Sequence, residues 1–383
     1  MGLLIIAPLR DDHALAVMWS LRRAGLDSWL WDPTAFPSQG TISLNPTELQ
    51  THRLEVHTLK GERVDLPLQH VKAVWCRRMM RAAPYLDFSH IHPADLGFVI
   101  EQASGMIRNV WDWLATVLAD VPWVNPLNAH VESNSKGKQL LMAQRAGFAI
   151  PPTLISNHPQ QVRAFCEQHQ DDLIYKTFTP ASWQDEPARS LPTSRVCLKD
   201  LQDDQAIQSS PGIYQARIEK AHELRVLVCG THILAARIHS QEQAASSTDW
   251  RTQQGQLRME PCELKADDRA RIRSFMQGMG LAFGSLDLVV TPQDELVFLE
   301  VNEQGQFLFL ESHCPALPAL ATVSSFFAEQ LGLRRPHPWP DFASCKADAQ
   351  LAEWRNQHHR HRPTPTRSIA YRFIEPPQPS GQG

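Results

Sequence analysis

The hydrophobic pattern of the first 125 residues predicts an α/β domain built on parallel strands. A short apolar run is followed by a stretch in which apolar side chains recur every three or four residues, and then by a second apolar run. The order strand, helix, strand is typical of a parallel sheet with a helical crossover. The predicted elements are a strand at 3–8, a helix at 13–24, strands at 28–31 and 71–75, and one or two helices within 94–119.

Two further segments combine helices with strands, and a different composition follows them. The expected units are an N-terminal domain at 1–125, subdomains at 126–212 and 213–333, and a proline- and histidine-rich tail at 334–383, which we expect to be extended or disordered. The expected fold class is therefore α/β, with an α+β C-terminal part.

Turn and cap residues divide the two subdomains into elements. Ser133 or Asn134 is expected to N-cap a helix that Gly147 ends, and residues 179–195, rich in proline and serine, are expected to form a loop. The other predicted elements are helices at 135–146, 158–168, 266–278 and 318–331, strands at 149–155, 173–178, 213–218, 224–229 and 232–238, and a hairpin at 285–301.

Composition excludes several classes of protein. Hydrophobic residues make up 43% and charged residues 20% of the 383, which is ordinary for a globular protein, and the net charge of −4 gives no sign of nucleic-acid binding. No stretch approaches the roughly 20 apolar residues of a membrane span. The N-terminal apolar run lacks the basic residues that open a signal peptide. Seven scattered cysteines share no metal-ligand spacing, so we expect reduced thiols in a cytoplasmic protein.

The predicted hairpin carries the most informative polar residues. Its Pro-Gln-Asp-Glu loop places Thr291 opposite Leu296, and the same register places Asp287 opposite Glu300, with Asn302 on the face of Glu300. Directly opposed like charges repel, so two carboxylates within apolar strands require a cation. Three oxygen donors suit magnesium, which also takes substrate phosphates. The alternative is a solvated sheet face that carries acids by chance.

Basic residues also occur where apolar side chains are expected. Lys136 lies in the first turn of a helix, Lys176 inside an apolar strand, and Arg225 and Arg251 in comparable surroundings. A buried cation is costly unless it meets an anion, and arginine suits bidentate phosphate contacts. The alternative for Lys176 is an ammonium that reaches the surface. No GxxxxGK(S/T) or GxGxxG motif is present, which disfavours Walker-type and Rossmann-type nucleotide sites.

These features occur together in one known superfamily. Two lysines spaced by 40, a Gln-x-x-Ile strand, an arginine strand and an Asp…Glu-x-Asn hairpin follow in the order found in ATP-grasp enzymes. More specifically, the chain resembles the ATP-grasp maturases of ribosomal peptides, the microviridin-type or graspetide ligases. The similar segments, which span most of residues 1–332, are VWCRRM at 74–79, where the family has Val-Trp-Tyr-Arg-Arg, and the blocks at 123–157, 214–230, 247–251 and 280–311.

The resemblance implies a three-part ATP-grasp architecture, with a Rossmann-like α/β domain ahead of the ATP-grasp subdomains and with ATP and Mg²⁺ as cofactors. Arg225 and Arg251 are the implied catalytic residues, and Ala216 stands where the family often has Glu. The implied roles are, in chain order, Arg77 and Arg78 on the substrate side, Lys136 and Lys176 on the α- and β-phosphates, the backbone of Gln215, Ala216, Arg217 and Ile218 as the hinge that receives adenine, Arg225 and Arg251 facing the γ-phosphate and the acyl phosphate, and Asp287, Glu300 and Asn302 as magnesium ligands.

The function implied by the resemblance is that of an ATP-dependent carboxylate–amine or carboxylate–alcohol ligase. A side-chain carboxylate of a ribosomal precursor peptide, made of leader and core, would become an acyl phosphate. A Ser or Thr hydroxyl or a Lys amine of the same peptide would then displace phosphate and close a macrocyclic ester or amide. Positioning and charge neutralisation would supply most of the catalysis. The family often forms dimers, so a homodimer is among the expected states, whereas neither nucleic acid nor a membrane is an expected partner.

Two other functions fit parts of the sequence. One is a ligase that adds free amino acids to a peptide or protein, like the ribosomal-protein glutamate ligases, because the general ATP-grasp residues fit both activities. The other is a non-catalytic member that binds nucleotide or peptide, which the complete lysine and Asp/Glu/Asn sets disfavour. The sequence leaves open the identity of the peptide, the choice of ester or amide, and the number and connectivity of rings.

Overall fold

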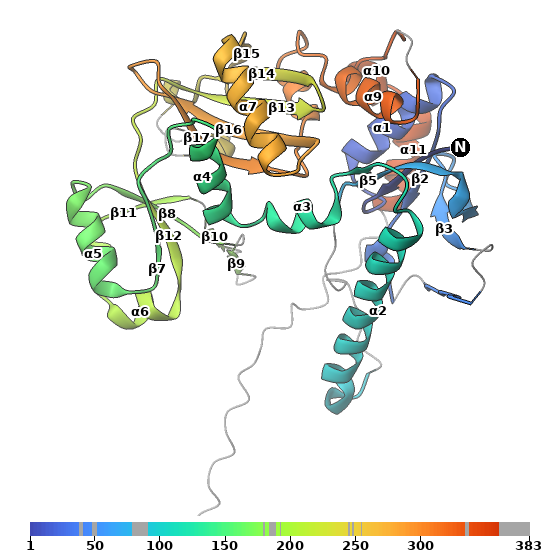
Figure 1. Cartoon of the computed structure of the whole chain (residues 1–383), viewed down its shortest axis with the longest axis horizontal. Coiled ribbons are helices and arrows are strands. Elements are labelled where there is room, and N and C mark those ends of the chain that lie inside the picture. Colours follow the sequence, from blue (N-terminus) through green and yellow to red (C-terminus); the bar gives the residue numbers. More distant parts are fainter. Residues whose placement is uncertain are drawn as a thin grey trace, which may run out of the picture.

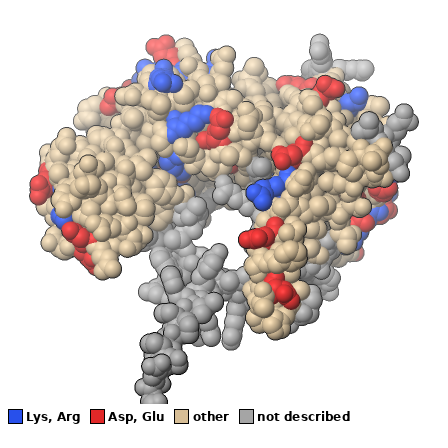
Figure 2. All heavy atoms as spheres, turned by 60° about the horizontal axis from the view of Figure 1, so that its bottom comes forward, with Lys and Arg blue, Asp and Glu red and all other residues tan. Residues whose placement is uncertain are grey.

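Two lobes flank a central sheet in this protein (Figure 1). The structure, a computed structural model, describes residues 1–37, 41–47, 52–78, 91–178, 181–183, 189–191, 193–243, 246, 249–253, 255–333 and 337–359. Within these residues the strands form sheets of six, two, four and five strands. The described helices include none with the length and apolar character needed to cross a bilayer. Figure 2 shows that one face is hollowed between the two lobes.

The N-terminal lobe contains the predicted α/β domain. Its sheet has the order β4-β3-β2-β1-β5-β6, in which β1 pairs in parallel with β2 and β5, and β5 with β6. The antiparallel strands β3 and β4 were not predicted, although the alternation of polar and apolar residues in Arg53–His57 is that of a half-buried strand. The bounds are β1 Gly2–Ile6, α1 Asp12–Arg23, β2 Asp27–Trp31, β3 Arg53–His57, β4 Arg63–Pro67, β5 Val71–Cys76, α2 Leu96–Val117 and β6 Trp123–Val124.

The opposite lobe is a sheet of order β11-β8-β12-β7, with α5 packed against it. Residues 179–195, predicted to form a loop, instead contain the hairpin of β9 and β10 and the start of β11. Strand β12 pairs with β7 and β8, so this sheet extends past the boundary predicted at residue 212. The bounds are α3 Leu127–Glu132, α4 Lys136–Arg145, β7 Thr153–Ser156, α5 Pro159–Gln168, β8 Leu173–Lys176, β9 Ala181–Trp183, β10 Arg189–Leu191, β11 Ser194–Val196, α6 Asp204–Ser209 and β12 Gly212–Ala216.

The sheet between the lobes, β15-β14-β13-β16-β17, divides its two faces between core and site. Alternate residues such as Val226 and Leu288 are buried under α4 and α7. The residues between them, such as Arg225 and Asp287, face away from this core and line pockets. The bounds are β13 His222–Cys229, β14 His232–Ile238, β15 Met259–Pro261, α7 Ala266–Gly278, β16 Phe283–Val290, β17 Leu296–Asn302, α8 Leu308–His313 and α9 Ala319–Gln330.

The hairpin of β16 and β17 reaches the predicted pairing by a different route. Val290, not Thr291, lies opposite Leu296, so the register predicted from the loop is wrong at that end. A β-bulge at position 299 shifts the register by one residue, and Asp287 therefore lies opposite Glu300 as predicted. The bulged strand directs both residues 299 and 300 toward one pocket.

The C-terminal tail is folded over part of its length. Helices α10 (Phe342–Lys346) and α11 (Ala349–His359) pack on α1 and α9 (Figure 1). The expectation of an extended or disordered tail is therefore wrong for residues 341–359, where spaced apolar side chains enter the core. Residues 360–383 lie outside the described part of the chain. The side chains of residues 341–359 that are buried in the core are Phe342, Cys345, Leu351 and Trp354.

Candidate active site

A pocket between the central sheet and the sheet of β8 and β12 gathers most of the predicted ATP residues. Strands β16 and β17 form one wall, and β8, β12 and the segment after β12 form the other. Three apolar residues that were not predicted, Ile174, Val289 and Leu299, also line the pocket. They form an apolar surface that suits a planar nucleotide base. The predicted residues that line it are Lys176, Gln215, Ala216, Arg217, Ile218, Arg251, Asp287 and Glu300.

Lys136 reaches this site from the first residue of α4. The helix is capped by Ser135, whose hydroxyl accepts a hydrogen bond from the Lys138 amide, so the prediction of Ser133 or Asn134 as the cap is wrong. Asn134 and Ser133 belong to the turn before it. With the helix start so placed, the Lys136 ammonium donates to Glu300 Oε2 at 2.6 Å.

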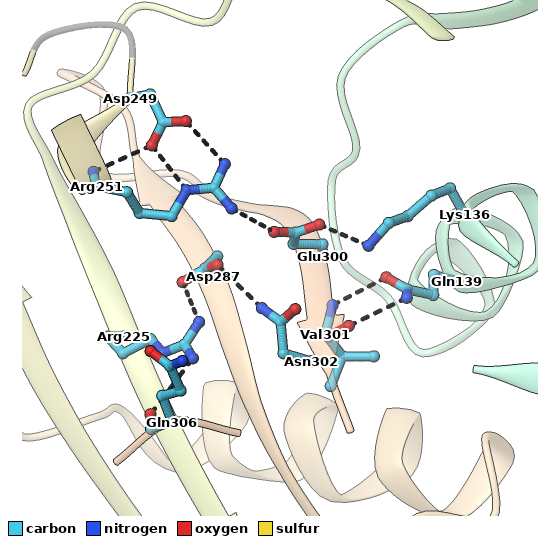
Figure 3. Close-up of polar contacts among 10 residues, drawn as sticks. All are labelled: Lys136, Gln139, Arg225, Asp249, Arg251, Asp287, Glu300, Val301, Asn302 and Gln306. Carbon is cyan, nitrogen blue, oxygen red and sulfur yellow. Dashed lines mark hydrogen bonds and ion pairs between the residues drawn. The ribbon is translucent and has the colours of Figure 1, made fainter. Parts of the chain in front are cut away.

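Glu300 is surrounded by cations (Figure 3). Besides the contact with Lys136, its Oε1 accepts from Arg251 Nη1 at 3.3 Å. Burial alone would raise the pKa of Glu300, but Lys136 and Arg251, together with Lys176, outweigh burial and bring that pKa to about 2. Glu300 is therefore ionised throughout the physiological range.

Lys176 is the most desolvated of these cations. It lines the pocket at the end of β8, and burial lowers the pKa of its ammonium, while the charge of Glu300 raises it. An ammonium so placed lacks much of its hydration and gains from any further anion that enters the pocket.

Asp287 has a cationic partner of its own. Arg225 Nη1 donates to Asp287 Oδ1 at 2.8 Å, and both side chains are buried. The expectation that the opposed carboxylates require a cation is confirmed, and side chains already supply cations to both: Arg225 to Asp287, and Lys136 and Arg251 to Glu300. Asn302 Nδ2 approaches Asp287 Oδ2 at 3.4 Å, which brings the predicted metal residues together.

The residues present fit a magnesium ion. Asp287, Glu300 and Asn302 offer carboxylate and amide oxygens on adjacent strands, which is the donor chemistry that Mg²⁺ prefers when phosphates complete its shell. Within the described residues no cluster of three or more His, Cys, Asp or Glu side chains forms an all-protein metal site. The site therefore suits a metal that arrives with a phosphate ligand.

Two positioning residues of this site were not predicted. Asp249 accepts from Arg251 Nε and Nη2, both at 2.8 Å, and this pairing raises the pKa of Arg251 further. Gln139 of α4 binds both backbone groups of Val301, through Nε2 at 3.1 Å and Oε1 at 2.9 Å (Figure 3). The spacing Asp-x-Arg could have indicated Asp249 from the sequence, whereas no local pattern indicates the role of Gln139.

The predicted hinge follows β12. The Ala216 amide donates to Pro152 O at 2.9 Å, and the Gln215 side chain, which is buried, donates to Thr153 Oγ1 at 2.9 Å. The Arg217 side chain pairs with Asp172, which accepts a hydrogen bond from its Nε at 2.6 Å. These contacts fix the strand end, and they leave the main chain at Arg217 and Ile218 on the pocket wall.

A second pocket adjoins the first and contains the remaining predicted residues. Trp250, Arg251 and Asp287 line both pockets. Asn302 lines the second pocket. Four arginines also line it: Arg77, Arg78, Arg225 and Arg251.

Arg77 and Arg78 have different environments in this second pocket. Arg77 is fully buried, its Nε lies 3.3 Å from Asp11 Oδ1, and burial lowers the pKa of its guanidinium to about 10. Arg78 is partly exposed, and its Nη1 donates to Gln304 Oε1 at 2.6 Å. The structure thus joins a pocket for a nucleotide to one with an excess of cations.

The arrangement of these sheets is that of the ATP-grasp fold, as similar solved structures show. No family model and no curated protein matches the chain. Solved structures do: a RiPP-associated ATP-grasp ligase of Chryseobacterium gregarium in complex with ADP and a leader and core peptide is 23% identical, with a TM-score of 0.73, over 89% of this chain and 99% of that chain.

Two macrocyclases of Microcystis aeruginosa are also similar. MdnC, bound with precursor peptide MdnA, is 24% identical with a TM-score of 0.72, over 87% of this chain and all of that chain. MdnB is 25% identical with a TM-score of 0.66, over 85% of this chain and 98% of that chain. These similarities confirm the predicted fold class and, at the level of the fold, the resemblance to the graspetide ligases.

Proposed function

We propose that this protein is an ATP-dependent ligase that closes macrocyclic ester or amide bonds in a ribosomal precursor peptide. The observation that carries the proposal is the junction of the two pockets at Arg251 and Asp287. A nucleotide in the first pocket would direct its γ-phosphate toward a second pocket that has an excess of positive charge. A peptide carboxylate in the second pocket is the matching nucleophile.

The residues around the junction suit phosphoryl transfer. Lys136, whose ammonium contacts Glu300, and Lys176 would neutralise the phosphates, and Arg225 and Arg251 would bind the charge that develops on the transferring group. Bound magnesium, held by Asp287, Glu300 and Asn302, would add further neutralisation of the phosphates. A hydroxyl or amine of the same peptide then attacks the acyl carbon, loses its proton and displaces inorganic phosphate, so that the peptide loses one water in total per ring.

The partners and setting of this reaction belong to the same proposal. The similar structures contain ADP, magnesium and precursor peptides, which supports ATP, Mg²⁺ and a peptide with leader and core here. The seven cysteines are free thiols, which suits a cytoplasmic location. A homodimer is the oligomeric state that we propose.

Co-expression with the peptide of a short reading frame beside the gene tests the function. We expect the peptide to lose the mass of one water per ring, with no loss when Glu300→Gln replaces the wild type. A gain of whole amino-acid residues would instead identify a ligase that adds free amino acids. An unchanged peptide, together with ADP binding, would identify a non-catalytic nucleotide-binding protein.

A further inference from the structure

The folded part of the C-terminal tail joins the two ends of the chain. Phe342, Cys345, Leu351 and Trp354 are between 0% and 8% exposed and share one core with α1 and α9. The similar structures are matched over 98–100% of their own lengths but over only 85–89% of this chain. This chain therefore contains residues beyond those matched in the similar structures.

The start of α10 is fastened to the C-terminal subdomain by a buried carboxylate. Glu311 of α8 accepts from the Phe342 amide at 2.6 Å and from the Leu320 amide at 2.8 Å. One side chain therefore holds the first residues of α9 and α10 together. Removing it would leave two buried amides unpaired, which proteins rarely tolerate.

The end of the segment is fastened to the loop between β1 and α1. Trp354 Nε1 donates to Leu9 O at 3.0 Å, and Arg355 Nε donates to Asp12 Oδ1 at 2.8 Å. The two contacts lie on either side of Asp11. The indole is buried, which shelters its contact from competing water, whereas the Asp12 side chain is 54% exposed and its contact with Arg355 is open to water.

Asp11 is the residue through which this loop meets the second pocket. Its carboxylate lies 3.3 Å from Arg77 Nε and 3.5 Å from Arg78 Nε. Within the described part of the chain, both terminal nitrogens of Arg77 are buried without a hydrogen-bond partner, and Asp11 is the carboxylate that pairs with its Nε. A buried guanidinium that loses its counterion is strongly destabilised. Small displacements of the loop therefore change where these arginines point.

We propose that residues 341–359 form a positioning strap for the peptide side of the active site. The strap holds the β1–α1 loop in place, and the loop in turn holds Arg77 and Arg78 through Asp11. The proposal rests on the proposed function for the substrate of that pocket. It makes the strap necessary for productive binding of the peptide carboxylate and unimportant for nucleotide binding, since no strap residue lines the nucleotide pocket.

Point variants of the full chain separate these two effects. Trp354→Phe keeps the ring and removes the donor to Leu9, and Arg355→Ala removes the contact with Asp12. Each should raise the KM of the co-encoded peptide about fivefold, the usual effect of one hydrogen bond, and leave the Kd of ADP within twofold. Exchanging the charges, Asp12→Arg with Arg355→Asp, should restore the peptide KM. Arg22→Ala, which loses an exposed contact with Gln350, is the matched control and should change neither constant.

Amide hydrogen exchange tests the strap independently of the peptide. The Ala14 amide donates to Asp11 Oδ1 at 3.0 Å, so its exchange reports on the loop. We expect about tenfold faster exchange there in Trp354→Phe and Arg355→Ala. Unchanged exchange in both variants would overturn the proposal, as would a Kd of ADP that rises as much as the peptide KM. A wild-type enzyme that closes no ring, but whose loop responds as expected, would overturn the proposed function and leave the strap standing.

Discussion

Replacing Glu300 by glutamine removes one negative charge from a group of cations and keeps the shape of the side chain. In the structure the carboxylate contacts Lys136 at 2.6 Å and Arg251 at 3.3 Å, and its side chain is 17% exposed. Reasoning from the opposed pair alone would have the variant more stable, because repulsion from Asp287 is lost. The structure reverses this expectation, since three cations, Lys136, Arg251 and Lys176, attract the Glu300 carboxylate.

The size of the effect follows from the pKa of Glu300. A value of about 2 against the ordinary 4.5, at about 1.4 kcal/mol per pKa unit, gives about 3 kcal/mol. Solvent screens the share of Arg251, whose side chain is half exposed, so we expect Glu300→Gln to lose about 2–3 kcal/mol at pH 7. A lowered folded-state pKa stabilises above the unfolded value. The difference between variant and wild type should therefore shrink as the pH falls from about 4.5 toward 2.

Urea unfolding of the nucleotide-free protein, followed by tryptophan fluorescence at pH 7 and at lower pH, measures this difference. Asp294→Asn is the matched control, because it makes the same kind of change in the same hairpin, at an exposed carboxylate that pairs with the exposed Lys265. It should leave stability unchanged. A Glu300→Gln protein as stable as the wild type at pH 7, or more stable, would show that the attraction between Glu300 and these cations does not stabilise the fold.

Two further substitutions probe the site and its support. Lys176→Met should raise the Kd of ADP at least tenfold, since a charge-assisted hydrogen bond is lost, and should change the free energy of unfolding without nucleotide by less than about 1 kcal/mol, because a desolvated ammonium is removed too; calorimetry that finds the same Kd would refute the assignment. Asn125→Ala should lower the free energy of unfolding by about 3 kcal/mol or more, because Asn125 donates to Phe283 O and Glu303 O and accepts from the Phe283 amide; a melting temperature within a degree of wild type would contradict this.

The sequence predicted the elements whose signal is local. The helix at α1 and the strands of the hairpin have strong periodic patterns, and their types were predicted correctly. The pairing of Asp287 with Glu300 was also predicted, but from a register that is wrong at the turn. The bulge at position 299 compensated for that error, and no residue type near Leu299 indicates a bulge in the sequence.

The contacts that depend on distant segments could not be predicted. Gln139 satisfies the backbone of Val301 across 162 positions, and the residues around it look like an ordinary amphipathic helix. The strap was mistaken for a disordered tail because its few apolar residues become informative only once α1 provides a partner for Trp354. Contacts with residues far away in the sequence determine the role of Gln139 and the folding of residues 341–359, and a single sequence does not show which residues are in contact.

The nucleotide-free site is arranged so that its cations are held in place before any phosphate arrives. Asp249 lines the first pocket and accepts from Arg251 with both of its oxygens, and because it is not a proposed metal ligand this pair can persist when a nucleotide binds. Glu300, in contrast, holds Lys136 and is also a proposed metal ligand, so its negative charge must be shared once phosphates enter. Preorganised charges lower the reorganisation needed in a transfer reaction. We therefore expect the Asp249–Arg251 pair to be retained when a nucleotide binds, and the contact between Glu300 and Lys136 to weaken.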